Sequence, residues 1–138
     1  YYDFSLRFTG VNALWHNPDV KIRSAPARVA GVDWQIVLER RPCTFNKVTK
    51  DHLYIGIALV GDIPDDRTWS VTAKHTLYQQ ETGNLNMRHQ STPATFSRTA
   101  NMFLFKHIDI KELFSRAHYV VDDALLLSVE MDIFPSQP

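Results

Sequence analysis

The chain has 138 residues, of which 44% are hydrophobic and 22% are charged, a balance typical of one folded domain. It argues against disorder, which requires low hydrophobicity and a high net charge. Fifteen Lys and Arg residues balance fifteen Asp and Glu residues, so the overall charge does not favour nucleic acid as a partner. Uninterrupted apolar runs such as Met102–Phe105 fall far short of the roughly 20 residues of a membrane-spanning helix, and no membrane partner is expected.

The cysteine content bears on the cellular compartment. Cys43 is the sole cysteine and cannot form a disulfide within the chain, and no Asn-x-Ser/Thr glycosylation site is present. Both observations favour a reducing compartment, the cytoplasm or the nucleus. We interpret Cys43 as a buried or partly exposed thiol in a loop. The start at Tyr1-Tyr2-Asp3-Phe4, without an initiator Met or a signal peptide, indicates a fragment of a longer protein, with residues 1–138 forming a single domain.

Apolar and polar residues alternate along much of the chain, and a period of two predicts β-strands. The clearest alternation covers five segments: Phe4–Phe8, Val32–Leu38, Leu53–Leu59, Trp69–Leu77 and Leu125–Ile133. Shorter candidates are Ala27–Ala30, Ala94–Ser97 and Met102–Lys106. Seven to eight short strands separated by turn residues predict an all-β fold, an antiparallel β-sandwich.

Four segments between these strands are predicted to be connections. Gly61–Asp66 and Glu81–Asn84 carry the Gly, Asn, Asp and Pro residues that favour turns. Asn12–Ser24 and Arg41–Asp51 are longer and polar, and we expect extended loops there. Asp122-Asp123 is expected at a turn or strand entry, because Asp side chains accept hydrogen bonds from nearby backbone amides.

One segment departs from the strand pattern. Asp109 and Glu112 have the spacing of a capping box, in which the first residue accepts from amides of the first helical turn. Apolar residues then recur at helical spacing through Ala117. We therefore predict one short helix at Ile110–Ala117, near one end of the sandwich.

No catalytic or cofactor signature is present. The chain lacks a glycine-rich phosphate loop, a G-x-S-x-G elbow and an H-E-x-x-H motif. No two of its six histidines lie three or four residues apart, although His75 and His107 could meet in space. We expect no enzyme activity, no cofactor and no metal site.

The order of the landmarks is more informative than any single motif. A Trp strand, Asp33–Leu38, precedes the apolar segment Asp51–Val60; then follow Trp69–Ala73, Phe96, and finally Tyr119–Leu125, which contains Val-Val-Asp-Asp-Ala-Leu. This order and spacing resemble the MATH domain (meprin and TRAF homology), closest in style to the MATH–BTB adaptor proteins. The resemblance implies an eight-stranded antiparallel sandwich of TRAF-like topology that binds short extended peptides of partner proteins.

By the same landmarks, the peptide-binding positions of the family fall on six residues of this chain: Gly56, Ala73, Ala94, Asn101, Met102 and Leu104. Aromatic side chains that line the groove of a peptide-binding member are replaced here by small or aliphatic ones. A groove of this composition should be broader and flatter, and Met adapts to varied partners. We interpret Met102–Phe105 first as a buried strand, because both faces of a short apolar run can belong to the core. The functional alternative is that Met102 and Leu104 share the outer face and line this groove.

The resemblance leaves several functional alternatives. The leading hypothesis is a non-catalytic module that recruits substrates to a cullin-type ubiquitin ligase through a BTB-containing parent. A structural or self-association module with a vestigial groove is a second. A third is the substrate-recruiting domain of a ubiquitin-specific protease. The isolated domain is expected to be a monomer, with a parent that dimerises through another domain.

Overall fold

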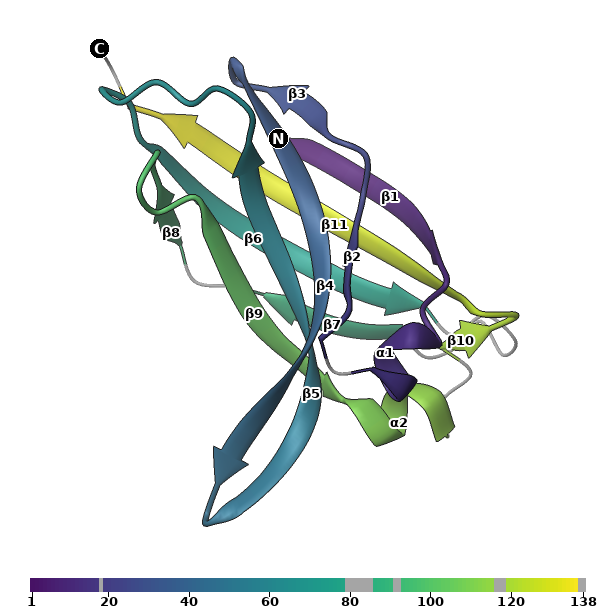
Figure 1. The fold of residues 1–138 in the computed structure, drawn as a ribbon. Coiled ribbons are helices and arrows are strands. Elements are labelled where there is room, and N and C mark those ends of the chain that lie inside the picture. Colours follow the sequence, from purple (N-terminus) through teal and green to yellow (C-terminus); the bar gives the residue numbers. More distant parts are fainter. Residues whose placement is uncertain (18, 79–85, 91–92, 116–118, 137–138) are drawn as a thin grey trace.

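The computed structural model describes residues 1–17, 19–78, 86–90, 93–115 and 119–136. In this part of the chain, two antiparallel sheets pack face to face as a sandwich with short helices at one end (Figure 1). The predicted all-β antiparallel sandwich is therefore confirmed. The predicted turn at Glu81–Asn84 lies outside the described residues.

Sheet I contains both ends of the described chain. Its order is β1-β11-β6-β7, and two short strands flank this path, β10 on β11 and β8 on β6. The strands span β1 (Tyr2–Thr9), β6 (Trp69–Tyr78), β7 (Asn86–Gln90), β8 (Ala94–Phe96), β10 (Val120–Val121) and β11 (Ala124–Pro135). The pairing of β1 with β11 joins Tyr2 to Met131, so β11 is a central strand that the chain supplies last.

Sheet II has the order β2-β4-β5-β9, with β3 paired to β4. Its strands are β2 (Lys21–Arg23), β3 (Ala27–Val29), β4 (Val32–Phe45), β5 (Val48–Val60) and β9 (Met102–Asp109). Among the described strands, β9 is therefore an edge strand, hydrogen-bonded only to β5.

The core lies between the two sheets and is built from the inward residues of the alternating strands. Trp34 and Trp69 are fully buried there. The Trp34 ring packs edge-on against Phe96, with 5.3 Å between the ring centroids, and its Nε1 donates to the carbonyl of Val29 at 2.9 Å. Trp15, in contrast, is 43% exposed and packs against Phe114.

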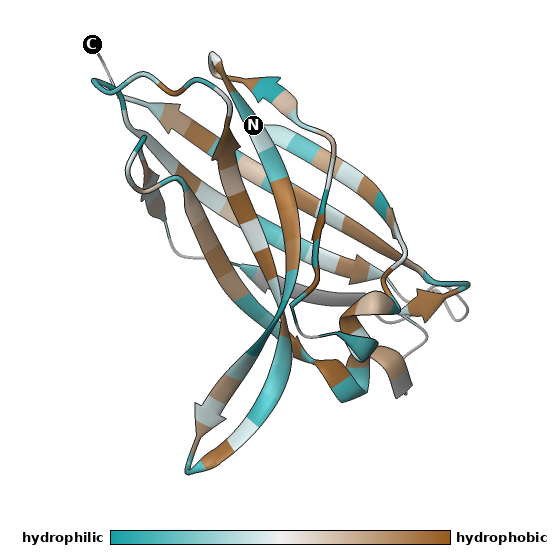
Figure 2. Cartoon of the chain, in the orientation of Figure 1, coloured by the Kyte–Doolittle hydropathy of each residue, from teal (hydrophilic) through white to brown (hydrophobic). Residues whose placement is uncertain are grey.

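The prediction of a loop at Arg41–Asp51 is wrong. β4 and β5 continue through this segment as one long hairpin, paired from Asp33–Val60 to Phe45–Val48. Figure 1 shows its end extending beyond the sandwich, and we call residues 41–51 the hairpin arm. The arm meets solvent on both faces, and its residues are coloured mostly teal to white in Figure 2. Its apolar residues, Cys43, Phe45 and Val48, lie on one face, and they are too few among polar neighbours to have marked the two strands.

The arm closes in a two-residue turn. Asn46 and Lys47 have φ values of 50° and 63°, as a type I′ hairpin turn requires. Asp122 and Asp123 form the same kind of turn between β10 and β11, with φ values of 51° and 61°, which confirms the predicted turn. The Asp123 carboxylate accepts from the backbone amide of Asn12 at 2.6 Å.

The predicted loop at Asn12–Ser24 contains structure as well. It holds helix α1 (Ala13–His16) and strand β2. The predicted helix near 110 is α2 (Ile110–Ser115), and residues 116 and 117 lie outside the described chain. Asp109 Oδ1 accepts from the Lys111 amide at 2.8 Å, as the capping prediction requires. Neither helix of the described residues is long and apolar enough to cross a membrane.

Candidate functional site

Strand β9 presents two different faces. Phe103 and Phe105 pack against the core between the sheets, and the Phe103 ring lies 4.6 Å from that of Phe96. Met102 and Leu104 alternate with them, so they lie on the outer face of sheet II, where each is half-buried. Of the two alternatives that the sequence left for this segment, the structure shows the one in which Met102 and Leu104 share the outer face.

The same residues border an unpaired backbone edge. The amide of Leu59 donates to the carbonyl of Asn101 at 2.7 Å, so Asn101 directs its backbone toward β5. Backbone groups alternate in direction along a strand, and those of Met102, Leu104 and Lys106 therefore point away from β5. In the described chain no strand pairs with that side of β9. An exposed strand edge is a template for pairing with another polypeptide.

Gly56 supports the position of Leu104. The two residues are direct cross-strand partners, and an added Cβ at Gly56 would lie 2.7 Å from Leu104 Cδ2 and 3.3 Å from Val37 Cβ. The Leu104 side chain therefore lies across the glycine, in space that any other residue would fill. Ala58, the cross-strand partner of Met102, is 3% exposed, so Met102 and Leu104 supply the apolar surface that reaches solvent here. We call Gly56, Ala58, Met102 and Leu104 the apolar groove, after the groove that the resemblance implies at these strands.

The structure does not bring all six expected site residues together. Gly56, Met102 and Leu104 meet in the apolar groove, and the exposed Asn101 lies at its end. Ala73 belongs to β6 of sheet I and is 1% exposed, with its side chain in the core. Ala94 belongs to β8, also of sheet I, and packs against the core. These two residues cannot contact a segment that lies over Leu104, and we remove them from the candidate site.

A polar cluster follows the apolar groove toward the hairpin arm. Lys106 Nζ lies 3.8 Å from Cys43 Sγ. The two residues lie on either side of strand β5, where Tyr54 is the cross-strand partner of Lys106. Partial burial raises the pKa of the Tyr54 phenol, the nearby Cys43 adds to the rise, and Arg41 opposes it. The phenol therefore keeps its proton at neutral pH and adds no negative charge. Cys43 lies on a strand rather than in the loop that the sequence predicted.

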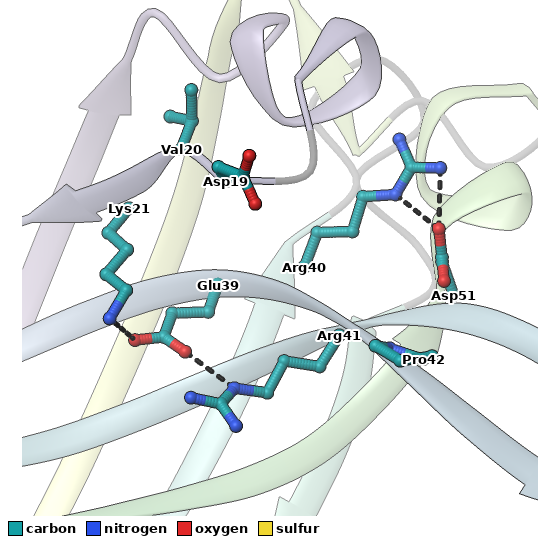
Figure 3. A pocket seen from close by; sticks show the side chains of 8 residues that line it. All are labelled: Asp19, Val20, Lys21, Glu39, Arg40, Arg41, Pro42 and Asp51. Atoms are coloured by element: carbon teal, nitrogen blue, oxygen red, sulfur yellow. Dashed lines mark hydrogen bonds and ion pairs between the residues drawn. The ribbon is translucent and has the colours of Figure 1, made fainter.

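A buried carboxylate lies beside this cluster. Glu39 is 3% exposed, and Figure 3 shows Lys21 and Arg41 on either side of it. Lys21 Nζ lies 3.5 Å from Glu39 Oε1, and Arg41 Nε donates to Oε2 at 2.7 Å. The two cationic side chains remain about half exposed, at 50% and 49%. Glu39 is therefore neutralised within the protein, whereas both cations still face solvent.

Arg40 anchors the base of the hairpin arm. Its guanidinium contacts Asp51 Oδ2 at 2.6 Å and donates to the carbonyls of Leu14 and Trp15 at 3.2 and 2.8 Å. In Figure 3 it is turned toward Asp51, away from the Glu39 group. These contacts join the C-terminal end of α1 to both strands of the arm. A hollow of about 300 Å³ lies at this point. Its acidic side chains, Asp19, Glu39 and Asp51, are balanced by Lys21, Arg40 and Arg41.

The two histidines that the sequence placed near the core lie close together. The ring centroids of His75 and His107 are 6.5 Å apart, and His75 also packs against Phe105. His75 is fully buried. Within the residues that the structure describes, no three His, Cys, Asp or Glu side chains gather in a way that could hold a metal ion.

Sequence reasoning missed the cationic part of this face. Arg41 and Lys50 lie in the arm, and Lys21 and Arg23 lie in β2, two segments that were predicted as loops. Extending the β4 alternation past Leu38 would have placed Glu39, Arg41 and Cys43 on one face. The Asn46-Lys47 turn gave only a weak signal because it lacks the usual glycine.

The comparisons with known proteins add no assignment. A scan against models of known protein families finds no match to this chain. A search of curated proteins finds no similar sequence.

Proposed function

We propose that this protein is a non-catalytic peptide-recognition module of the MATH type, and that it binds an extended segment of a partner protein along β9. The observation that carries the proposal is the free edge of β9. There, the backbone groups of Met102 and Leu104 face away from β5, while their side chains form the apolar groove beside that edge. Backbone pairing supplies affinity and the alternate side chains supply specificity in recognition of this kind.

The landmark resemblance and the sandwich architecture support this proposal together. In a longer parent chain that also carries a BTB domain, the module recruits substrates for a cullin-type ubiquitin ligase. We place this activity in the cytoplasm or the nucleus. The lone, half-buried Cys43 accords with a reducing compartment.

The test is peptide capture by the chain and by its Leu104→Asp variant, using a random ten-residue display library. Leu104→Asp places a charge in the apolar groove, and we expect it to abolish capture. Leu126→Asp is the matched control, because Leu126 is half-buried on the outer face of sheet I. Thermal unfolding shows whether each variant is folded. Capture that is unchanged in a folded Leu104→Asp variant contradicts the proposal.

Self-association is the alternative outcome for the same edge, because a second copy could pair with β9. Light scattering at several concentrations separates the two. A mass that stays at 15.9 kDa argues against self-association, and a mass that doubles in a Leu104-dependent way favours it over peptide capture.

A further inference from the structure

The outer face of sheet II carries an excess of positive charge. Strand alternation and register place Arg28 of β3 there, together with five further cationic side chains from β2, β4, β5 and β9: Lys21, Arg23, Arg41, Lys50 and Lys106. Glu39 is the carboxylate among them, and Asp33, farther along β4, is paired with Arg28 at 3.4 Å. We call the five side chains the cationic face. The chain as a whole has no net charge, so this excess is local.

Few of these charges are neutralised within the protein. Lys21 and Arg41 share the single Glu39 carboxylate. Arg23 contacts the neutral amide of Gln35 at 3.3 Å, and Lys106 contacts the Cys43 thiol. Within the described residues, no ion pair joins a carboxylate to Arg23, Lys50 or Lys106. The cationic face is therefore complementary to an anionic partner.

Apolar surface lies at both ends of the cationic face. At one end is the apolar groove on β9. At the other, the tip of the hairpin arm exposes Phe45 and Val48, at 75% and 55%. A hollow of about 430 Å³ connects the tip to Lys50 and Lys106. An occupant of the whole surface would meet apolar, cationic and again apolar side chains in turn.

We propose that the bound segment is an acidic peptide, in which Asp or Glu side chains face Lys106, Lys50 and Arg41 while an apolar side chain lies over Leu104. This inference rests on the proposed function. A polypeptide is favoured over a lipid surface or a nucleic acid because only a polypeptide can pair with the free backbone edge of β9. Lys106 lies on β9 itself and Lys50 lies on the neighbouring β5, so separate carboxylates of an added strand can meet them, whereas a phosphate group is held by donors that converge on one point.

The register predicts the spacing of the motif. Leu104 and Lys106 are two residues apart on the same face of β9, about 7 Å along the strand. A strand added beside β9 has the same repeat. Its apolar residue opposite Leu104 and its acidic residue opposite Lys106 are therefore separated by one position.

The experiment selects ligands for the whole chain from the random ten-residue library and then measures synthetic peptides. We expect enrichment of an apolar residue and an Asp or Glu separated by one position. Replacing Asp and Glu in a selected peptide by Asn and Gln should weaken binding about tenfold. This measurement needs no protein variant, so it holds even where a variant fails to fold.

Variants of the protein provide the reciprocal test. Lys50→Glu combined with Lys106→Glu should weaken binding of the acidic peptide at least tenfold. Arg7→Glu with Lys74→Glu makes the same charge change on the outer face of sheet I and should leave binding within about twofold. Raising the salt concentration should weaken binding of the acidic peptide more than binding of its neutral analogue.

The outcomes separate the two proposals. Ligands that depend on Leu104 but show no acidic enrichment and no response to Lys50→Glu with Lys106→Glu overturn the acidic inference and leave the proposed function intact. No Leu104-dependent ligand at all overturns both. Phosphoserine peptides that bind more tightly than their Asp or Glu analogues overturn the inference in favour of a phosphate site. Binding only to phosphatidylserine vesicles overturns it in favour of a membrane surface.

Discussion

The two outer faces of the sandwich differ in charge and in how they are bordered. The outer face of sheet I carries acidic residues, Asp3, Glu130 and Asp132, together with Arg7 and Lys74. These charges nearly cancel in number, and Glu130 has both the cationic Lys74 and the acidic Asp3 as cross-strand neighbours. The cationic face of sheet II has no such balance, and it adjoins a free strand edge. The net charge of the chain therefore describes neither face, and partner chemistry must be argued face by face.

The largest expected effect comes from the anchor of the hairpin arm. Arg40→Met leaves the Asp51 carboxylate and the Leu14 and Trp15 carbonyls without the guanidinium, and we expect the free energy of unfolding to fall by about 1–2 kcal/mol. Arg7→Met on sheet I should change it by less than about 0.5 kcal/mol. Chemical denaturation measures both. Equal effects would contradict the anchoring role of Arg40.

The next effect concerns the apolar groove. Gly56→Ala forces the Leu104 side chain aside, because the new Cβ would lie 2.7 Å from Leu104 Cδ2. Peptide binding should weaken about tenfold, or about 1.4 kcal/mol, while the fold is retained because Leu104 ends in free space on the outer face. Adding Leu104→Val should restore part of the loss by making room. Isothermal calorimetry on the double-mutant cycle measures the coupling, and purely additive losses would contradict the direct contact.

A smaller effect should have the opposite sign. Glu39→Gln keeps the shape of the side chain but removes the carboxylate that Lys21 and Arg41 share, so an acidic peptide should bind about two- to fivefold more tightly. Asp132→Asn makes the same charge change on sheet I and should have no effect. Titration at low and high salt measures the difference, which should shrink as salt rises. Weaker binding by a folded Glu39→Gln variant would contradict the charge argument.

The smallest effect distinguishes two similar turns. Lys47 has a φ of 63°, a conformation that favours glycine, and Lys47→Gly should stabilise the protein by about 0.5 kcal/mol. Asp123 has nearly the same φ of 61°, but its carboxylate accepts from the Asn12 amide. Asp123→Gly should therefore destabilise the protein. Melting temperatures that move in the same direction for both variants would contradict this distinction.

The sequence predicted those parts of the fold in which one face is buried. The alternation from Trp69 to Leu77 predicted β6 because every second residue there enters the core. The hairpin arm was missed because neither of its faces is buried, so only Cys43, Phe45 and Val48 interrupt its polar sequence, too few to indicate two strands. For Met102 and Leu104 the sequence left two alternatives, because a short apolar run can be buried on both faces, and the structure shows the outward one, with Phe103 and Phe105 packed against the core.

The errors at the site have a different origin. Ala73 and Ala94 were grouped with Leu104, although β6 and β8 belong to sheet I. Which strands share a sheet depends on pairing between distant segments, and a local period of two carries no information about it. The cationic face was missed for the same reason, since Lys21 and Lys106 become neighbours of Glu39 and Cys43 only through the pairing of β2, β4, β5 and β9.

The position of β11 in sheet I has a consequence for how the protein forms. A chain synthesised from its N-terminus makes β1 and β6 long before β11, the strand that lies between them. Tyr2, for example, can pair only after Met131 has been synthesised. Until then both strands expose backbone groups that other chains could pair with. The long sequence separation of this pairing also predicts slow folding. A nascent chain of this protein is therefore open to misassembly until β11 leaves the ribosome, and removal of β11 alone should prevent folding of the domain.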